Sequence, residues 1–264
     1  HLGYNYVQVG QENSFTWGAM AKGFVTQTER LVELREAGKV RIETLGQTGR
    51  WFKEKYPLTP TTTVITTEDP RSQSRKTLWF NSRNYRVNLL WEGKDLKFRD
   101  IFNENLRSEY IDTPDTLPVF RYETLPIVDG CLWSSSSRMA GLHVVAPGFE
   151  GGDPVFSSGD KGRRQDVLWP SVSGSSGFML RLSEDRIEIA PKGKVGEWAL
   201  ELTVAPGARL PFTEISPGEV KASFLGLDYR MTVGCGHAED LRPEGDGAVL
   251  RIYPEHGKIV LLPK

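Results

Sequence analysis

From Leu78 to the end of the chain, hydrophobic residues recur at every second position in short runs that turn residues separate. A period of two places successive side chains on opposite faces of a β-strand. The clearest runs are Leu78–Phe80, Tyr85–Leu89, Leu96–Phe98, Phe178–Leu182, Ile187–Ile189, Trp198–Val204, Val220–Phe224, Tyr229–Val233, Val249–Tyr253 and Ile259–Leu262. So many short strands with regular turns predict an antiparallel two-sheet β-sandwich.

The chain ahead of this region has a different pattern, in which strands alternate with helices. We predict strands over Tyr4–Val9 and Val40–Thr44, where β-forming residues are enriched. The first is followed by a loop and a helix that starts at Thr26 or Thr28 and ends at Gly38, and the second by an amphipathic helix over Gln47–Tyr56. This alternation is typical of a parallel α/β layer.

These patterns predict a mainly β protein: an antiparallel two-sheet β-sandwich preceded by a short α/β segment. The α/β segment is expected over residues 1–67 and the β-sandwich domain over residues 72–264. Lys and Arg number 33 and Asp and Glu 34, so the basic face that nucleic-acid binding needs is not expected. The sequence has no apolar run of about 18 residues, which predicts no membrane span.

Two cysteines, Cys131 and Cys235, lie far apart in the sequence and neither belongs to a CxxC pair. Two buried thiols are favoured, and one disulfide remains the alternative. The first residues lack a basic region followed by an apolar core, so they do not form a signal peptide, although a cleaved one stays open. The compartment is therefore undecided, with an extracellular or periplasmic location among the alternatives.

Motifs for phosphate-loop, dinucleotide, zinc-protease, α/β-hydrolase and EF-hand chemistry are all absent. Glu12 and Glu43 are the most suggestive carboxylates, because each follows or ends a predicted parallel strand, where active sites form. Two such groups can act as acid and base, or as acid and nucleophile, on a glycosidic bond. The alternative is that Glu12 is a surface residue and Glu43 is a cap or ion-pair partner of the next helix.

The segment Asp129–Gly177 is rich in Gly and Ser, and long loops of this kind are often functional. Tryptophans can stack on sugar rings, while arginine and histidine can hydrogen-bond a hydroxyl or carboxylate. The candidate substrate-binding residues are Trp17, Trp133, Arg138, His143 and Trp169. Ordinary core packing for the tryptophans, and surface or core positions for the other two, are the alternatives.

The sequence GCGHAED contains Cys235, His237, Glu239 and Asp240, a mixture of potential metal ligands. A second pair of soft ligands is missing, so a surface loop is favoured over a metal site. Asp153, Asp160 and Asp166 do not match the spacing of a calcium loop either. We expect no metal and no cofactor.

The phrase VRIETLGQTGRWFKEKYPLTPTTTVI, preceded by YVQVGQENSFTWG, resembles the closing strand–helix units of a glycoside-hydrolase-like (β/α) barrel with an appended C-terminal β-sandwich. The resemblance covers roughly residues 4–67 and extends over residues 78–264 by architecture alone. It implies a carbohydrate context, with an oligosaccharide or polysaccharide as partner. It also implies that the front of the barrel, the missing N-terminal part of the same protein, lies outside this chain.

Three functions follow as hypotheses. The first is the C-terminal region of a carbohydrate-active protein that binds saccharide, and that hydrolyses glycosidic bonds with Glu12 and Glu43 if the rest of the barrel is supplied. The second is a non-catalytic carbohydrate-binding module that uses Trp133 and Trp169. The third is a structural β-sandwich that buttresses a catalytic domain and binds nothing.

Overall fold

The structure is a computed structural model that describes residues 7, 16–69, 71, 73–104, 125–224, 226–242 and 247–263. The chain divides into two compact units between Thr59 and Pro60. Among the described residues, no helix has the length and apolar character needed to cross a membrane.

The unit before Pro60 contains helices α1 (Trp17–Glu36) and α2 (Leu45–Lys55), and neither helix buries a residue. A capping box starts α2: the Thr44 hydroxyl accepts from the Gln47 N–H at 3.3 Å, and the Gln47 side chain accepts from the Thr44 N–H at 2.9 Å. The helix ends just before Pro57, because a residue that precedes proline is disfavoured in the α region.

The strand predicted over Val40–Thr44 is wrong, since these residues belong to no strand. Thr44 has extended backbone angles, but it uses them to cap α2 rather than to pair with a neighbouring strand. A β-forming composition makes a strand only where another strand supplies hydrogen-bond partners. The strand predicted over residues 4–9 lies outside the described residues except for Val7, which is in no strand. The regular structure described in this segment is therefore helical, and α1 begins at Trp17 after the N-cap Thr16 rather than at the predicted Thr26 or Thr28.

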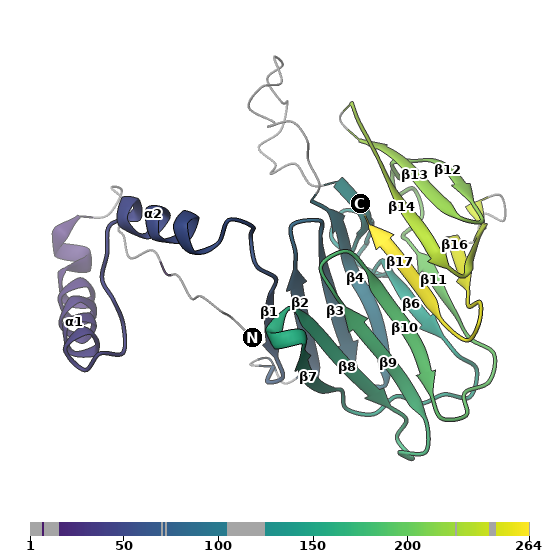
Figure 1. Ribbon diagram of the computed structural model, residues 1–264, viewed down its shortest axis with the longest axis horizontal. Helices are drawn as coiled ribbons and strands as arrows, with labels where there is room; N and C mark the ends of the chain where they lie inside the picture. Colours follow the sequence, from purple (N-terminus) through teal and green to yellow (C-terminus); the bar gives the residue numbers. More distant parts are fainter. Residues whose placement is uncertain are drawn as a thin grey trace. The chain divides into compact units, whose positions relative to one another are not determined.

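The second unit is the predicted two-sheet antiparallel β-sandwich, and Figure 1 shows its two sheets as layers. The nine-stranded sheet has the order β1-β2-β3-β4-β6-β11-β16-β15, with β5 paired to β4. Its strands are β1 (Thr62–Thr66), β2 (Arg75–Asn81), β3 (Tyr85–Glu92), β4 (Asp95–Asn103), β5 (Leu125–Asp129), β6 (Gly141–Val145), β11 (Ala199–Thr203), β15 (His237–Asp240) and β16 (Ala248–Tyr253).

The eight-stranded sheet has the order β12-β13-β14-β17-β10-β9-β8-β7, and its strand pairs are also antiparallel. Its strands are β7 (Val155–Gly159), β8 (Arg164–Pro170), β9 (Gly177–Leu182), β10 (Ile187–Lys192), β12 (Phe212–Ser216), β13 (Glu219–Phe224), β14 (Leu227–Cys235) and β17 (Ile259–Pro263). A short 3₁₀ helix, Asp160–Gly162, joins β7 to β8.

The core lies between the sheets and is made by the period-two positions of the sequence. Fully buried side chains come from both sheets, because each strand turns alternate residues inward. They include Leu78, Phe80, Tyr85, Phe98, Leu142, Phe178, Leu180 and Leu182. The same alternation turns the intervening residues to the outer faces of the sandwich.

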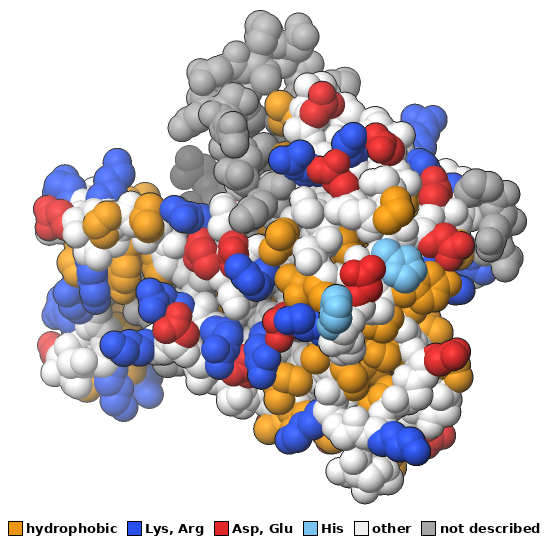
Figure 2. Space-filling view, turned by 45° about the vertical axis from the view of Figure 1, so that its right-hand side comes forward, with side chains coloured by type: hydrophobic (Ala, Val, Ile, Leu, Met, Phe, Trp, Pro, Cys, Tyr) orange, Lys and Arg blue, Asp and Glu red, His pale blue; other side chains and the backbone are white. Residues whose placement is uncertain are grey.

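Strand β1 falls within residues 1–67, the predicted α/β segment, but it pairs with β2 over Thr62–Thr66. It therefore belongs to the nine-stranded sheet. The sequence GCGHAED, for which a surface loop was favoured, lies instead at the end of β14 and along β15. Over the sandwich, Figure 2 shows Lys and Arg side chains lying next to Asp and Glu side chains rather than in a separate patch.

Candidate functional site

Strand register brings one residue from each of five neighbouring strands into a line across the nine-stranded sheet. Lys97 on β4 is opposite His143 on β6, which is opposite Glu201 on β11. Glu201 is in turn opposite Arg251 on β16, and Arg251 is opposite Glu239 on β15. We call these five residues the polar row. Directly opposed residues have Cβ atoms about 4.5–5.5 Å apart, so neighbouring members of the row interact.

The polar row lies on the outer face of the sheet. The residues that adjoin its members along the strands point into the core, among them Phe98, Leu142, Leu200, Ile252 and Ala238. Because side chains alternate between faces, the row members point the other way. Although it points outward, Lys97 is only 8% exposed, and His143, Glu201 and Arg251 are partly buried. The row is thus a half-sheltered line rather than a fully solvated one.

His143 lies at the middle of the most sheltered part of this row. Burial lowers its pKa below the ordinary 6.5, and the positive charge of Lys97 lowers it further, against the opposing effects of Asp95, Glu201 and Glu92. The imidazole has no hydrogen bond to any residue that the structure describes. At neutral pH it is therefore an uncharged ring with one donor and one acceptor nitrogen available.

Glu92 forms ion pairs with both Lys97 and Arg75. The Arg75 Nε atom lies 2.7 Å from Glu92 Oε1. Burial alone would raise the pKa of Glu92, but Lys97 and Arg75 outweigh it and leave that pKa below its ordinary value. Glu92 is therefore a carboxylate at neutral pH. Glu92 offsets one of the two positive charges of Lys97 and Arg75, and Asp95 supplies a second negative charge near His143.

The other end of the row is a connected network. Arg251 Nε donates to Glu201 Oε2 at 2.8 Å, and a second guanidinium nitrogen contacts the same oxygen. Arg251 also donates to the Tyr253 hydroxyl at 3.4 Å, which donates to Glu239 at 3.1 Å. The His237 ring stacks on Tyr253, with centroids 5.1 Å apart. Packing and hydrogen bonds thus hold the orientations of Glu201 and Arg251.

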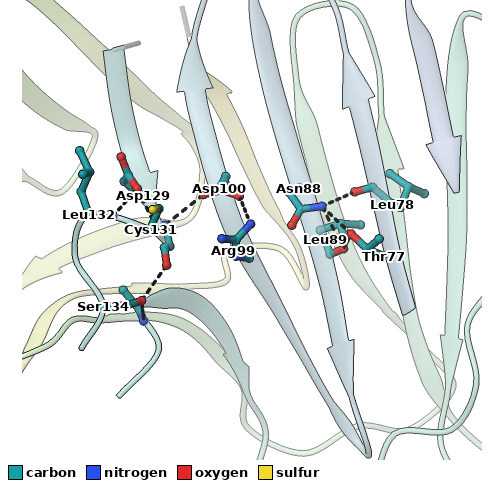
Figure 3. A network of polar contacts seen from close by, with 12 residues as sticks. Thr77, Leu78, Asn88, Leu89, Arg99, Asp100, Asp129, Cys131, Leu132 and Ser134 are labelled. Atoms are coloured by element: carbon teal, nitrogen blue, oxygen red, sulfur yellow. Dashed lines mark hydrogen bonds and ion pairs between the residues drawn. The ribbon is translucent and has the colours of Figure 1, made fainter. Parts of the chain in front are cut away.

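A second polar cluster lies farther along the same sheet, where Asp100 on β4 is opposite Asp129 on β5 (Figure 3). Asp100 accepts from the Gly130 N–H at 3.0 Å and pairs with Arg99. Asp129 accepts from the N–H groups of Cys131 and Leu132 at 2.9 and 2.7 Å. Burial raises the pKa of Asp100, an effect that Arg99 and Gly130 oppose. Each carboxylate caps backbone groups, which indicates a structural role at the end of β5.

Asn88 makes a similar structural contact on β3. Its side-chain amide donates to the Thr77 hydroxyl at 2.6 Å and to the Leu78 carbonyl at 3.1 Å (Figure 3). These bonds join β2 to β3 beyond their backbone ladder. Since Asn88 and Thr77 satisfy one another, we assign them to the scaffold rather than to a site.

Glu12 lies outside the described residues, and the structure does not place Glu43 at a strand end. Glu43 precedes α2, where it pairs with Arg41 and accepts from the Thr48 hydroxyl at 3.0 Å. This is the ion-pair role that the sequence left as the alternative. The reason that favoured Glu43 as a catalytic residue therefore does not apply.

Trp133 and Trp169 lie in the core of the sandwich, 2% and 3% exposed. The Trp133 ring packs edge-on against Phe212 at 5.6 Å, and the Trp169 ring packs against Phe149 at 4.9 Å and Phe178 at 5.9 Å. Neither indole face is open to a sugar ring, so the stacking role predicted for them does not fit this placement. The ordinary core packing kept as the alternative describes both.

The remaining predicted binding residues lie apart from one another. Trp17, 61% exposed, is the first residue of α1 and packs edge-on against Phe24. Arg138 is in the serine-rich loop, where a guanidinium nitrogen donates to the Val204 carbonyl at 3.4 Å. Of the five predicted binding residues, only His143 lies in the polar row. No group of three or more potential metal-ligating side chains occurs in the described part of the chain.

Cys131 and Cys235 are both free thiols in the structure. The prediction of two thiols rather than a disulfide agrees with the structure. The prediction that they are buried does not, because Cys131 is exposed and Cys235 is partly exposed. Cys235 donates to the Glu255 carbonyl at 3.2 Å.

Sequence reasoning missed Lys97, Glu201 and Arg251. Each is a single polar residue at an outward position of a predicted strand, which is the usual place for a solvated side chain. The signal that unites them is strand register, and β4, β6, β11 and β16 are far apart in the sequence. A pattern within one strand cannot supply that register.

No protein-family model matches this chain, and no curated protein is significantly similar to it. Among solved structures, the chain is similar to one described as "Active YidC insertase crystal structure with the first transmembrane domain resolved", with a TM-score of 0.38 and 8% identity. The match covers 83% of this chain and 44% of that one, so this chain spans less than half the length of that structure. A likeness this weak carries no argument about function.

Proposed function

We propose that this chain binds saccharide through the polar row, as the C-terminal region of a carbohydrate-active protein. The observation that carries the proposal is His143: a partly buried, uncharged imidazole without a hydrogen-bond partner among the described residues, between Lys97 and Glu201. Unpaired polar groups that are sheltered but reachable are typical of ligand sites.

The chemistry of the row suits hydroxyl groups. A sugar hydroxyl donates one hydrogen bond and accepts others, and the row offers both kinds of partner. Lys97 and Arg251 donate, Glu201 accepts, and the neutral His143 ring can do either. Because Glu201 and Arg251 are held by their own network, they would lose little conformational freedom when a ligand binds.

The shape of the site favours an extended ligand. Five strands at a spacing of about 4.8 Å place the ends of the row about 19 Å apart. The row crosses the outer face of a sheet from strand to strand, whereas a small molecule is usually enclosed in a pocket. We therefore propose an oligosaccharide or polysaccharide chain laid across the strands.

Isothermal titration calorimetry with a panel of neutral and acidic oligosaccharides tests the proposal. Saturable heat that disappears in a variant of the polar row is the expected result. Heat that continues after each injection would indicate that the chain hydrolyses the oligosaccharide rather than only binding it. Absence of binding heat with every oligosaccharide of the panel would reject the proposal and favour a β-sandwich that only buttresses a catalytic domain.

Replacing His143 by Ala is expected to weaken saccharide binding about tenfold, the effect of losing roughly 1.4 kcal/mol of hydrogen bonding. His143→Gln keeps one donor and one acceptor and should retain part of the affinity. Glu188→Gln is a matched control, because Glu188 pairs with Arg181 across β9 and β10 on the other sheet. Equal weakening by the control would show that the effect is not specific to the row.

Binding is also expected to depend on pH through His143. Its folded-state pKa is lower than the ordinary 6.5, so the ring stays neutral as the pH falls through 6.5 and gains a proton only in more acid solution. Affinity should therefore be constant around neutrality and fall at acid pH, when the acceptor nitrogen is lost. The measurement is the dissociation constant as a function of pH. His143→Gln should remove this step, and a step of unchanged size in that variant would assign it to another group.

A further inference from the structure

We infer that the polar row selects uncharged oligosaccharides and rejects acidic ones. This inference rests on the proposed function and adds the class of ligand. The observation behind it is that the cations of the row and its surroundings already have carboxylate partners in the folded chain. An incoming carboxylate would have to compete with them.

The pairing is specific on both sides of His143. On the β4 side, Glu92 contacts Lys97 and Arg75 together, and Asp95 adds a further negative charge near the imidazole. On the β11 side, two guanidinium nitrogens of Arg251 contact Glu201 Oε2. Three cations thus stand beside three carboxylates, and the surroundings of His143 have no net charge.

An acidic sugar meets a penalty at such a place. Its carboxylate would approach Glu201 on one side and Glu92 and Asp95 on the other, and like charges repel. It would also lose hydration without gaining an unpaired cation in return. A neutral sugar avoids both costs, because hydroxyls hydrogen-bond to paired carboxylates and guanidinium groups without disturbing the ion pairs.

The ionic-strength dependence separates the two cases. Binding of a neutral oligosaccharide should change little between low and high salt, since no ion pair forms with the ligand. Binding of an acidic one through free cations would weaken as salt screens it. Calorimetry at two salt concentrations measures the dissociation constants of a neutral glucan oligosaccharide and of a uronic-acid oligosaccharide, and so compares their salt dependence.

Removal of one carboxylate should change the preference. Glu92→Gln leaves Lys97 and Arg75 without their partner beside His143. We expect the ratio of acidic to neutral affinity to rise about fivefold or more over the unaltered chain, and the gain to vanish at high salt. The double variant Glu92→Gln with Lys97→Gln should lose most of the gain, because Lys97 is the one of the two freed cations that lies in the polar row.

Glu188→Gln frees Arg181 on the other sheet and is the matched control, for which no change in the ratio is expected. Circular dichroism establishes that each variant is folded. If Glu92→Gln does not fold, the comparison of the neutral and the uronic-acid oligosaccharide on the unaltered chain still tests the preference for uncharged ligands. Tighter, salt-sensitive binding of the uronic-acid oligosaccharide to the unaltered chain would overturn this inference and leave saccharide binding intact. Absence of binding to any saccharide would instead overturn the proposed function.

Discussion

Replacing Trp169 by Ala is expected to lower the free energy of unfolding by about 3–5 kcal/mol, the usual cost of truncating a large buried aromatic side chain. Trp169 is 3% exposed and packs among Phe149 and Phe178. Gly151 lies against the same indole, since a Cβ there would be 2.3 Å from the ring. The ring therefore fills a space that has no other occupant, and its removal leaves a cavity.

Urea unfolding followed by circular dichroism measures this change. Trp169→Phe should cost much less, because it keeps most of the ring volume and removes a buried indole N–H that has no partner among the described residues. Trp17→Ala is the exposed control and should change stability by no more than about 0.5 kcal/mol. If Trp169→Ala kept full stability but lost saccharide binding, the indole would be a ligand platform rather than a core residue.

Replacing Tyr85 by Ala is expected to cost about 3–5 kcal/mol, because this side chain is fully buried on β3. Its hydroxyl lies 2.8 Å from the Ser183 carbonyl and 2.9 Å from the Arg186 carbonyl, and both belong to the turn between β9 and β10. Tyr85 therefore links the nine-stranded sheet to the eight-stranded sheet. Tyr85→Phe keeps the ring, loses this link, and should cost about 1–3 kcal/mol.

Alkaline pH gives a second measurement on Tyr85. Burial raises the pKa of its phenol well above 10.0, and the charges of Asp185 and Glu184 raise it further. The unfolded chain then releases this proton more readily than the folded chain, so stability is retained below pH 10.0 and falls above it. Burial also raises the pKa of Tyr229, so the two residues share the effect. Tyr85→Phe should reduce the loss of stability above pH 10.0, and an unchanged slope would assign the loss elsewhere.

The alternation along the strands could be read from the sequence. Leu78, Phe80 and Tyr85 belong to the runs in which hydrophobic residues recur at every second position, and all three are fully buried. Alternation works because burial of one sheet face repeats every second residue along a strand. The end of α2 before Pro57 followed in the same way, from the local backbone restriction that proline imposes.

Other assignments depended on partners that lie far away in the sequence. The β-forming residues Val40–Thr44 have no neighbouring strand in the described structure, so they form no strand, and Thr44 caps a helix. Trp133 and Trp169 occur in a stretch with the composition of loops, yet tertiary packing encloses both rings. Local composition indicates which secondary structures a residue tolerates. Whether that residue is buried depends on which distant segments of the chain pack against it.

The candidate site shows the same division. His143 could be named as a candidate from its residue type, but its relation to Lys97, Glu201 and Arg251 could not. The sequence by itself determined the period-two strands, the mainly β class and the end of α2 before Pro57, because these depend on interactions between near neighbours. Only the tertiary structure decided which strands pair and in which register, and therefore which charges face His143, since hydrogen bonds between strands distant in the chain set that register.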